Sequence, residues 1–418
     1  MAVLPLYLSA PGLVCCAGKD REDFFHAALA GDQSGIVPSI LPGDFRFFWG
    51  CVPDEWIPLA VPAVKEEAGF TEDTRLLRIC AAALKQIRPD VERAVEQYGP
   101  YRVGVCVGSC DNGSEWSLEA HRTYFTEGRF PPSYKLVFQS ASYPAGYAAR
   151  YFGLSGPSLG VATACASSAG AIVKAAELIR AGLCDAVVVG GVDIASEAAL
   201  RGFASLEAVS DEVCNPFSRN RKGITLGEGA AFFVLSPDRG RGIELLGAGE
   251  SADAHHMTAP RPDGAGAVRA MEEALDNAGI KPADVGYVNL HGTGTSLNDR
   301  MEAQAMAAVF GAGVPRRPGS LEPLVSSTKP VTGHTLGAAG ALELALCWMT
   351  VANANTGTAA SVPVHCWDGE YDMELPRLRF AGKGEAVPAE QLQICMSNSF
   401  AFGGCNTSLI IGKKPQKG

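Results

Sequence analysis

The chain has 418 residues, 47% of them hydrophobic and 19% charged, so it can bury a sizeable core in two or three domains or in one large duplicated domain. Its net charge of −10 argues against nonspecific nucleic-acid binding, which requires a basic surface. Thirteen cysteines, irregularly spaced and without a CxxC pair, indicate reduced thiols in the cytoplasm rather than disulfides or a zinc site.

The N-terminal stretch is apolar, but its first basic residue is Lys19, so it lacks the basic start of a signal peptide. We expect a buried first strand at Leu4–Ser9 instead. No uninterrupted apolar run reaches the roughly 18–20 residues of a membrane span. The sequence therefore predicts a soluble cytoplasmic protein without membrane insertion.

Short apolar runs predict strands that are buried on both faces, at Val103–Val107, Ala186–Gly190, Ala230–Leu235, Val285–Leu290 and Leu392–Met396. Helical patterns alternate with them, at Thr74–Ile87, Ser167–Ala181, Gly266–Ala278, Arg300–Phe310 and Ala338–Ala352. This alternation predicts an α/β fold with mainly parallel sheets covered by helices. A change of pattern near Ser236–Gly247 is the one plausible seam, and no sequence repeat is evident.

The segment Gly160–Ser168 places Cys165 where a strand-like run ends and a helix of small residues begins. A helix start favours a thiolate, and its free N–H groups can hold an oxyanion. The alternative is a buried core cysteine in front of a helix. A G-x-S-x-G pattern around Ser158 overlaps this segment, but a hydrolase elbow needs a helix directly after its serine. An apolar strand follows Ser158, so we interpret this serine as part of a turn.

Two histidines stand in glycine-rich loops. His291 follows the apolar run Val285–Leu290 and begins a Gly/Thr loop, and His334 lies on the turn Lys329–Gly340 that opens a helix. A lone histidine is more often structural, but two such placements among seven histidines favour catalysis. The loop Asn398–Asn406 can supply backbone donors and aromatic walls, although, taken alone, it is better explained as a plain β-hairpin connection.

These four motifs, in this order, resemble the β-ketoacyl-acyl carrier protein synthases of the elongating Cys-His-His class, similar to synthase II. Supporting stretches are Asn215–Arg219, Gly227–Ala230 and Asp253–Thr258, and the resemblance spans roughly residues 4–411. It implies a thiolase-like five-layer αβαβα fold of two similar halves. The half 1–245 would carry the nucleophile. The half 246–418 would carry both histidines and the loop Asn398–Asn406, which acts as the gating loop in this family. It also implies a dimer, either a homodimer or a heterodimer with a chain-length-factor-like subunit.

The resemblance also implies an activity. Cys165 would take an acyl group from acyl carrier protein and condense it with a malonyl-carrier thioester after decarboxylation, giving a 3-oxoacyl product. His291 and His334 would stabilise the enolate, and the N–H groups of Cys165 and Phe402 would form the oxyanion hole. The substrates would be attached as thioesters to the carrier's phosphopantetheine, and neither another cofactor nor a metal is expected.

Further roles follow from the same resemblance. Lys329 would act electrostatically beside the triad, with Glu302 as its acidic partner. Thr293, Thr295 and Thr258 would bind the pantetheine arm. Phe400, Phe402 and Asp111 would form the gate and the acyl pocket.

The sequence departs from the family pattern in two places. Ala401 stands where the gating loop normally has glycine, and the Cβ of the alanine restricts the backbone. Asp111 stands where fatty-acid enzymes have an apolar residue along the acyl tunnel, and a carboxylate there is costly to desolvate. We hypothesise a specialised acyl chain, polar, aromatic or polyunsaturated, as in aryl-polyene synthases. The alternative is that Asp111 caps a turn.

An acidic carrier requires a basic rim at the tunnel mouth, for which the candidates are Arg122, Arg129, Lys135, Arg201, Arg219, Arg221 and Lys222. Four other functions remain as alternatives. They are general fatty-acid elongation only, a noncatalytic chain-length-factor subunit, a coenzyme A-dependent thiolase using Cys405 as its acid or base, and a serine hydrolase at Ser158.

Overall fold

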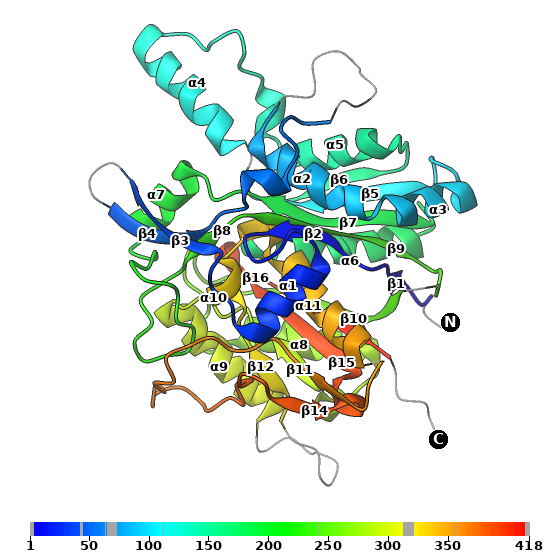
Figure 1. Ribbon diagram of the computed structural model, residues 1–418, viewed down its shortest axis with the longest axis vertical. Coiled ribbons are helices and arrows are strands. Elements are labelled where there is room, and N and C mark those ends of the chain that lie inside the picture. The colour runs from blue at the N-terminus through cyan, green and yellow to red at the C-terminus, as the bar shows by residue number, and fades with distance from the viewer. Residues whose placement is uncertain are drawn as a thin grey trace.

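Strands far apart in the sequence share one mixed sheet in the computed structural model (Figure 1). The strand order is β12-β11-β15-β16-β10-β1-β9-β7-β5-β6, and β2 (Gly12–Cys15) pairs with β9. The structure describes residues 4–41, 45–62, 64, 73–111, 113–240, 242–311, 322–354 and 356–413. Two small sheets accompany the main one, formed by β3 (Ile36–Leu41), β4 (Phe45–Gly50) and β8 (Leu226–Gly227), and by β13 (Ala359–Ser361) and β14 (Ala386–Pro388).

The N-terminal half of the main sheet combines parallel and antiparallel pairs. β5 (Val103–Gly108) lies between β6 (Ser158–Val161) and β7 (Ala186–Asp193) and is parallel to both. β9 (Gly229–Ser236) then runs antiparallel to β7. Every residue of β5, β7 and β9 is buried, as expected for strands covered on both faces.

The C-terminal half repeats this arrangement. β11 (Tyr287–Asn289) lies between β12 (Leu324–Ser326) and β15 (Ile394–Phe400) and is parallel to both. β16 (Cys405–Gly412) runs antiparallel to β15, as β9 does to β7. The expectation of mainly parallel sheets therefore holds only for the three strands at each end of the sheet.

Short β1 (Tyr7–Leu8) joins the halves by pairing with β9 on one side and with β10 (Ile243–Ala252) on the other. A boundary between residues 245 and 246 falls inside β10, at a register shift between Leu245 and Gly247. The division into halves 1–245 and 246–418 stays a prediction.

Two helices, α6 (Ser167–Arg180) and α11 (Ala339–Ala354), form the central layer between the two halves of the sheet (Figure 1). Each follows a single 3-10 turn, η3 (Ala164–Ala166) or η5 (Leu336–Ala338). Each turn begins with a non-glycine residue of positive φ, 48° at Ala164 and 51° at Leu336. The two halves therefore share a local geometry as well as a strand order, although no repeat is visible in the sequence.

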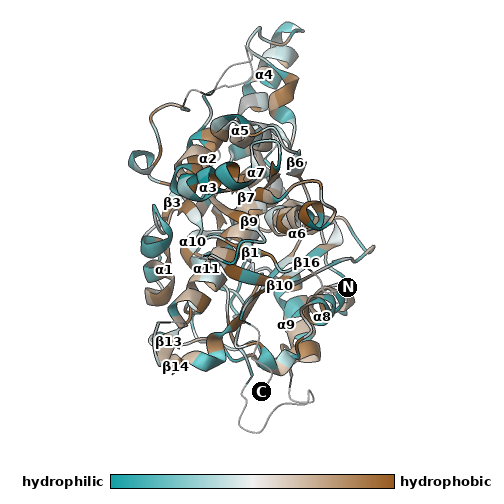
Figure 2. Ribbon diagram, turned by 90° about the vertical axis from the view of Figure 1, so that its right-hand side faces the viewer, coloured by the Kyte–Doolittle hydropathy of each residue, from teal (hydrophilic) through white to brown (hydrophobic). Residues whose placement is uncertain are grey.

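Outer helices complete the five layers. They are α2 (Arg75–Gln86), α3 (Arg88–Tyr98) and α5 (Tyr143–Phe152) on the N-terminal half, and α8 (Ala265–Ala278) and α9 (Ser296–Phe310) on the C-terminal half. The exposed α3 is largely hydrophilic, whereas α6 is mostly apolar (Figure 2). The predicted thiolase-like αβαβα fold is confirmed. One described segment, Leu336–Ala354, has the length and hydropathy of a membrane span, but 83% of it is buried as the core helix of this fold.

All five predicted helices are present, and α9 begins at Ser296, four residues earlier than predicted. The predicted strands differ in their ends. The run Leu4–Ser9 contributes only Tyr7 and Leu8, because Pro5 has no N–H for a ladder. The strand predicted at Leu392–Met396 begins at Ile394, because Ala389–Leu392 form a 3-10 turn.

Close packing of β5 against α6 places the start of that helix. A Cβ on Gly108 would lie 2.2 Å from the Ser168 nitrogen, a distance that requires the helix or strand to move. We expect Gly108→Ala to lower the free energy of unfolding by about 1–3 kcal/mol, measured by urea denaturation. Gly202 in α7 (Glu197–Ser205) has open space around it, so Gly202→Ala is the matched control and should be neutral or stabilising. Equal effects of the two substitutions would contradict this packing argument.

Candidate active site

Cys165 lies in the 3-10 turn that precedes α6, and its side chain is buried. Ala164 has φ 48°, which turns the chain sharply between the end of β6 and the helix. Ser167 fixes this turn, because its hydroxyl donates to the Ala164 carbonyl at 2.6 Å and accepts the Thr163 N–H at 2.9 Å. The sulfur therefore occupies a set position at the first turn of a central helix.

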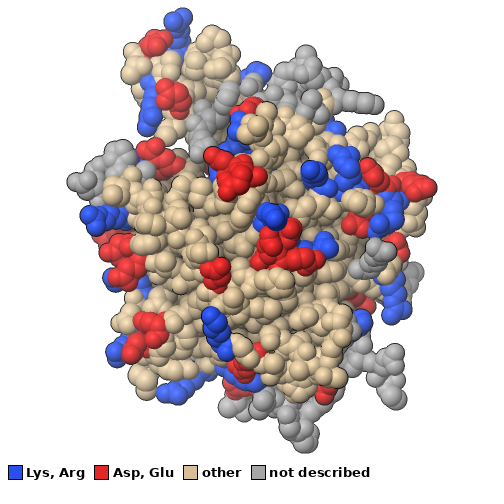
Figure 3. Space-filling model, viewed as in Figure 1, with Lys and Arg blue, Asp and Glu red and all other residues tan. Residues whose placement is uncertain are grey.

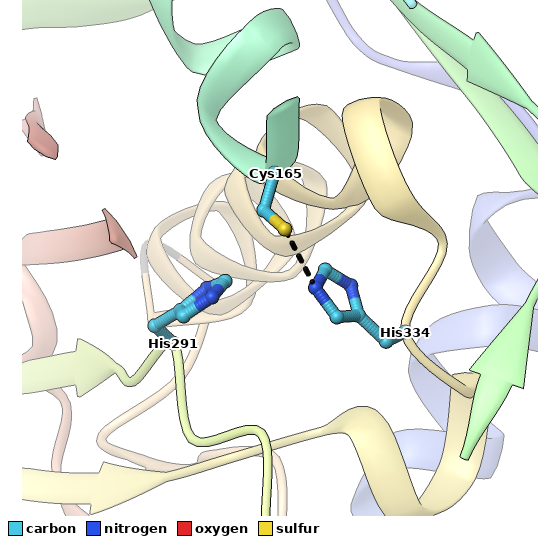
Figure 4. Close-up of side chains that lie close together, drawn as sticks. All are labelled: Cys165, His291 and His334. Atoms are coloured by element: carbon cyan, nitrogen blue, oxygen red, sulfur yellow. Dashed lines mark hydrogen bonds between the residues drawn. The ribbon is translucent and has the colours of Figure 1, made fainter. Parts of the chain in front are cut away.

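Both predicted histidines converge on this sulfur (Figure 4). The Nε2 atom of His334 is 3.0 Å from the Cys165 Sγ, and the His291 ring lies nearly perpendicular to that of His334 with centroids 5.3 Å apart. The Cys165 Sγ and one ring nitrogen from each histidine all lie within 4.8 Å of one another. The tertiary fold thus assembles residues that are 126 or more positions from the cysteine in the sequence.

Hydrogen bonds to the outer nitrogens decide the tautomers of these imidazoles. The Leu336 N–H donates to His334 Nδ1 at 3.3 Å, and the Lys329 ammonium lies 3.5 Å from His291 Nδ1. A neutral ring whose Nδ1 accepts a hydrogen bond carries its proton on Nε2. Burial, reinforced by the charge of Lys329, holds the pKa of both histidines well below the usual 6.5. Both rings are therefore neutral Nε2–H donors.

The Cys165 thiol is subject to opposing influences. Burial raises its pKa to about 11, while the Lys329 charge and a hydrogen bond from the Phe402 N–H act in the opposite direction. The sequence favours a thiolate at this helix start, but in the structure the desolvation of the sulfur is the larger effect.

The loop after β15 carries Phe402, whose backbone N–H reaches the Cys165 sulfur. Ala401 has φ −105° and packs beside Cys165 and Ala166, so its Cβ causes no strain there. The left-handed conformations of this loop fall on Gly403 (φ 84°) and Gly404 (φ 77°), which are glycines. The concern raised by Ala401 in the sequence therefore does not apply to the conformation observed.

The predicted pairing of Lys329 with Glu302 is wrong. The Lys329 ammonium, fully buried, donates to Glu343 on α11 and to the His291 carbonyl. Glu302 on α9 instead accepts the N–H groups of His291 and Gly292, at 2.8 and 2.7 Å, and so holds the histidine loop. The sequence did contain a signal for Glu343, because it is the one acidic residue in the apolar segment Ala339–Ala354, where a carboxylate requires a partner.

A third histidine, His365, was not singled out from the sequence. Its Nδ1 accepts the Ser327 N–H at 3.1 Å, its Nε2 donates to the Pro216 carbonyl at 3.2 Å, and its ring stacks on Phe380. Burial lowers its pKa to about 3, so the ring is neutral. Because the Ser327 hydroxyl donates to the Gly292 carbonyl at 2.6 Å, His365 supports the loop that carries His291.

A cavity of about 350 Å³ opens onto Cys165. Most of the predicted site residues line it, namely Cys165, His291, His334, Thr293, Thr295, Thr258, Phe400 and Phe402. The hydroxyls of Thr293 and Thr295 lie 3.0 Å apart on one side of it. Lys329 and Glu302 lie behind this wall and do not border the cavity.

Asp111 borders a different cavity of about 250 Å³, which shares no lining residue with the first. Its carboxylate accepts the hydroxyl and the backbone N–H of Ser114, the first residue of α4 (Ser114–Glu127). Asp111 thus caps a helix start and also faces a cavity lined by Phe138 and Tyr143. Burial raises its pKa above the usual value for Asp.

The alternative nucleophiles lie apart from this arrangement or at its edge. Ser158 begins β6 and is followed by strand rather than by helix, as its sequence context indicates. Cys405 begins β16 and packs at the edge of the small cluster that contains Cys165. Of the seven basic candidates for the rim, Arg221 and Lys222 line the cavity that opens onto Cys165.

The Lys329–Glu343 pair should be strongly coupled, because removing one partner leaves a buried charge uncompensated. We expect Glu343→Gln to cost about 3–5 kcal/mol of unfolding free energy, and the double change Lys329→Met/Glu343→Leu to cost less than Glu343→Gln alone. Urea denaturation of Glu343→Gln, of the single variants Lys329→Met and Glu343→Leu, and of the double variant measures this. Strict additivity of the Lys329 and Glu343 effects would contradict the pairing, and Glu302→Gln serves as the control for a carboxylate bound only to backbone N–H groups.

The chain matches two family models. The one described as beta-ketoacyl synthase, N-terminal domain, matches residues 74–239, and the one described as beta-ketoacyl synthase, C-terminal domain, matches residues 243–360. A curated relative, 3-oxoacyl-[acyl-carrier-protein] synthase 2 of Staphylococcus aureus (strain COL), is 32% identical over 360 residues, covering 81% of this chain and 82% of the relative. The enzyme of the same name from Coxiella burnetii is 30% identical over 421 residues, covering 96% and 97%.

A solved structure gives the same assignment. The complex of the ketosynthase ApeO with its chain length factor ApeC, from Xenorhabdus doucetiae, matches with a TM-score of 0.85 and 36% identity, covering 98% of each chain. The family models and these relatives confirm the resemblance drawn from the sequence motifs. This chain belongs to the β-ketoacyl synthase family.

Proposed function

We propose that this chain is a 3-oxoacyl-[acyl-carrier-protein] synthase, which condenses an acyl group held on Cys165 with malonyl-acyl carrier protein. The observation that carries the proposal is the arrangement around the sulfur. Two neutral imidazoles with Nε2–H groups and the backbone N–H of Phe402 surround the Cys165 thiol. Such a site can hold an acyl thioester and stabilise negative charge on a second thioester without supplying a cation.

In the first step the Cys165 sulfur attacks the carbonyl carbon of the acyl-carrier thioester. The new carbon–sulfur bond forms, the oxyanion is held by the N–H groups of Cys165 and Phe402, and the bond to the carrier sulfur breaks. The thiol proton of Cys165 ends on the released carrier thiol, so the exchange is balanced. The Lys329 charge and the Phe402 N–H both favour the sulfur in its negative form during attack.

In the second step the malonyl thioester loses carbon dioxide. The bond to the carboxylate carbon breaks, and its electron pair forms an enolate whose oxygen accepts hydrogen bonds from His291 and His334. The enolate carbon attacks the Cys165 thioester, the bond to sulfur breaks, and the 3-oxoacyl carrier product leaves. The Cys165 thiolate that remains takes a proton from solvent water, which restores the thiol. Neutral histidines suit this role, because a charged imidazolium would bind the intact malonate carboxylate as well. Glu302 and His365 support the His291 loop. Thr293, Thr295 and Thr258 line the cavity, which supports their proposed contact with the pantetheine arm.

The proposed partners are acyl carrier protein and a second subunit, either a copy of this chain or a chain-length-factor-like protein, as in the ApeO–ApeC complex. Two features support a dimer. β6 is an edge strand with a half-exposed Leu159, and α4 projects from the body of the molecule with Phe125 82% exposed (Figure 1). The thirteen free cysteines support a reducing compartment, the cytoplasm, and phosphopantetheine on the carrier is the only prosthetic group proposed.

The cavity beside Asp111 supports a specialised acyl chain, polar, aromatic or polyunsaturated, over plain fatty-acid elongation. It combines a carboxyl group with Ser109, Ser140 and the rings of Phe138 and Tyr143. The Asp111 carboxyl group already accepts from Ser114, and an acyl end that donates a hydrogen bond can engage this carboxyl group as well, which a saturated chain cannot do.

The other candidate functions are less well supported. A thiolase needs its second cysteine as acid or base, but Cys405 does not line the cavity that opens onto Cys165. A noncatalytic chain-length factor lacks the nucleophile, which this chain has, and a hydrolase at Ser158 lacks the helix that its elbow requires.

Incubation with acyl-carrier and malonyl-carrier thioesters should release carbon dioxide and yield an elongated product, followed by mass spectrometry. Cys165→Ala should abolish the acyl-enzyme, whereas Ser158→Ala and Cys405→Ala should leave it intact. We expect His291→Ala to keep acylation but to slow condensation by about 10²-fold or more, because one donor to the enolate is lost. Acyl-enzyme formation in Cys165→Ala would overturn the proposal.

The acyl preference can be tested with chains of matched length. The wild type should elongate a polyenoyl or aryl-ended carrier thioester better than a saturated one, and Asp111→Leu should shift kcat/KM toward the saturated chain by about tenfold. Ser114→Ala removes the hydroxyl that donates to Asp111 but keeps the carboxyl group and its bond from the Ser114 N–H, so it should lower stability and retain the preference. A wild-type preference for saturated chains would leave general fatty-acid elongation as the function.

A further inference from the structure

Asp193, the last residue of β7, is a buried acid that takes no part in the proposed reaction steps. Many acidic side chains lie on the face shown in Figure 3, where water solvates them, but Asp193 is completely buried. Burial, reinforced by the charge of Asp111, raises the pKa of Asp193 to about 7. A carboxyl group that is so costly to desolvate indicates a role at the site that it borders.

Three consecutive residues after β5 hold this carboxyl group. The Ser109 hydroxyl donates to Oδ1 at 2.8 Å, and the Asp111 N–H donates to the same oxygen at 2.9 Å. The N–H and the thiol of Cys110 donate to Oδ2 at 3.0 and 3.2 Å. Ser109 and Asp111 also line the cavity beside Asp111. Both oxygens of Asp193 are therefore fixed from the side of that cavity by neutral donors.

A further donor comes from the turn that follows His334. The Gly337 N–H, in η5, donates to Asp193 Oδ2 at 2.6 Å. A Cβ on Gly337 would lie 2.5 Å from that oxygen, so glycine is required for this close approach. The end of β7 itself packs tightly against the turn, because a Cβ on Gly191 would lie 3.2 Å from the Ala338 Cα. Asp193 thus joins the loop after β5 to the turn after His334.

The bond from Gly337 acts at a strained point of the backbone. Leu336 has φ 51°, a left-handed conformation that is unfavourable for a residue with a Cβ. The Gly337 N–H belongs to the peptide group that follows Leu336, so its bond to Asp193 fixes that peptide group. On the other side of the same residue, the Leu336 N–H donates to His334 Nδ1 at 3.3 Å. This bond keeps the His334 proton on Nε2, which lies 3.0 Å from the Cys165 sulfur.

We propose that Asp193 is a positioning residue for condensation, which orients the imidazole of His334 through the peptide group between Leu336 and Gly337. The inference rests on the proposed function, in which the Nε2–H of His334 donates to the enolate. With the carboxylate in place, the Leu336 N–H points at Nδ1 and the ring presents one tautomer to the substrate. Without it, Leu336 relaxes toward negative φ, which turns its N–H away from the ring.

Asp193→Asn tests this role, because the amide replaces one acceptor oxygen by a donor that faces other N–H groups. In single-turnover measurements, acylation of Cys165 should change by less than about threefold, whereas condensation should slow by about tenfold or more. Both rates are normalised to the fraction of Cys165 that can be acylated, which removes any loss of folded enzyme. The matched control is Asp185→Asn, because Asp185 precedes the same strand and pairs with Arg102 at the surface. It should leave both rates unchanged.

A double-mutant cycle separates positioning from a general structural effect. In an enzyme that already carries His334→Ala, adding Asp193→Asn should slow condensation by less than about twofold, because the ring to be positioned is absent. Gly337→Ala disrupts the same bond from the other side and should also slow condensation selectively, so it serves in place of Asp193→Asn if that variant does not fold. Equal slowing of acylation and condensation, or a full effect of Asp193→Asn in the His334→Ala background, would refute the positioning role.

The tautomer of His334 gives a readout that does not depend on turnover. In enzyme whose histidines carry isotopically labelled nitrogen, nuclear magnetic resonance should show a neutral Nε2–H ring for His334, identified by the signals that His334→Ala removes. Asp193→Asn should mix in the Nδ1–H tautomer, and Asp185→Asn should not. If the wild type forms no elongated product, the proposed function fails. An unaltered His334 tautomer in Asp193→Asn contradicts the positioning role independently of that result.

Discussion

The close contact between the starts of α6 and α11 is the constraint on which the rest of the site depends. The Ala341 N–H donates to the Ser168 hydroxyl at 2.9 Å, so the two helices are joined at their first turns. A Cβ on Gly340 would lie 2.9 Å from the Cβ of Ala169, which leaves no room for a larger residue. The abundance of small residues in both segments is therefore a packing requirement, and it places Cys165 and the turn that follows His334 side by side.

This packing also creates the electrostatic conditions of the site. The helices bury Lys329 and Glu343 together, and the ammonium group then contacts the carbonyl and Nδ1 of His291. One buried ion pair thus influences three groups, since the Lys329 charge lowers the pKa of both histidines and opposes the effect of burial on Cys165. The neutral state of the imidazoles results from desolvation together with this fixed charge, and no single contact accounts for it.

The two cavities separate general chemistry from the features particular to this chain. The groups around Cys165 lie against the sulfur itself, so in the proposed reaction they act in the same way on any acyl chain. The cavity at Asp111 has its own lining, and its carboxyl group is held by the first residue of α4. α4 also projects away from the body of the molecule, so the helix whose first residue holds the Asp111 carboxyl group also presents the exposed Phe125 (Figure 1).

The sequence by itself determined the local features of this protein. Strand and helix positions follow from apolar patterns of short range, and Cys165, His291 and His334 stand out because glycine and small residues surround each of them. Only the tertiary structure decided how distant residues pair. Lys329 meets Glu343 and not Glu302, because α11 crosses beneath the lysine while α9 directs its glutamate to the backbone of the His291 loop. His365, the repeated geometry of η3 and η5, and the contact between Asp193 and Gly337 were hidden for the same reason. Each depends on contacts between segments far apart in the chain, and local sequence patterns do not indicate which distant segments meet.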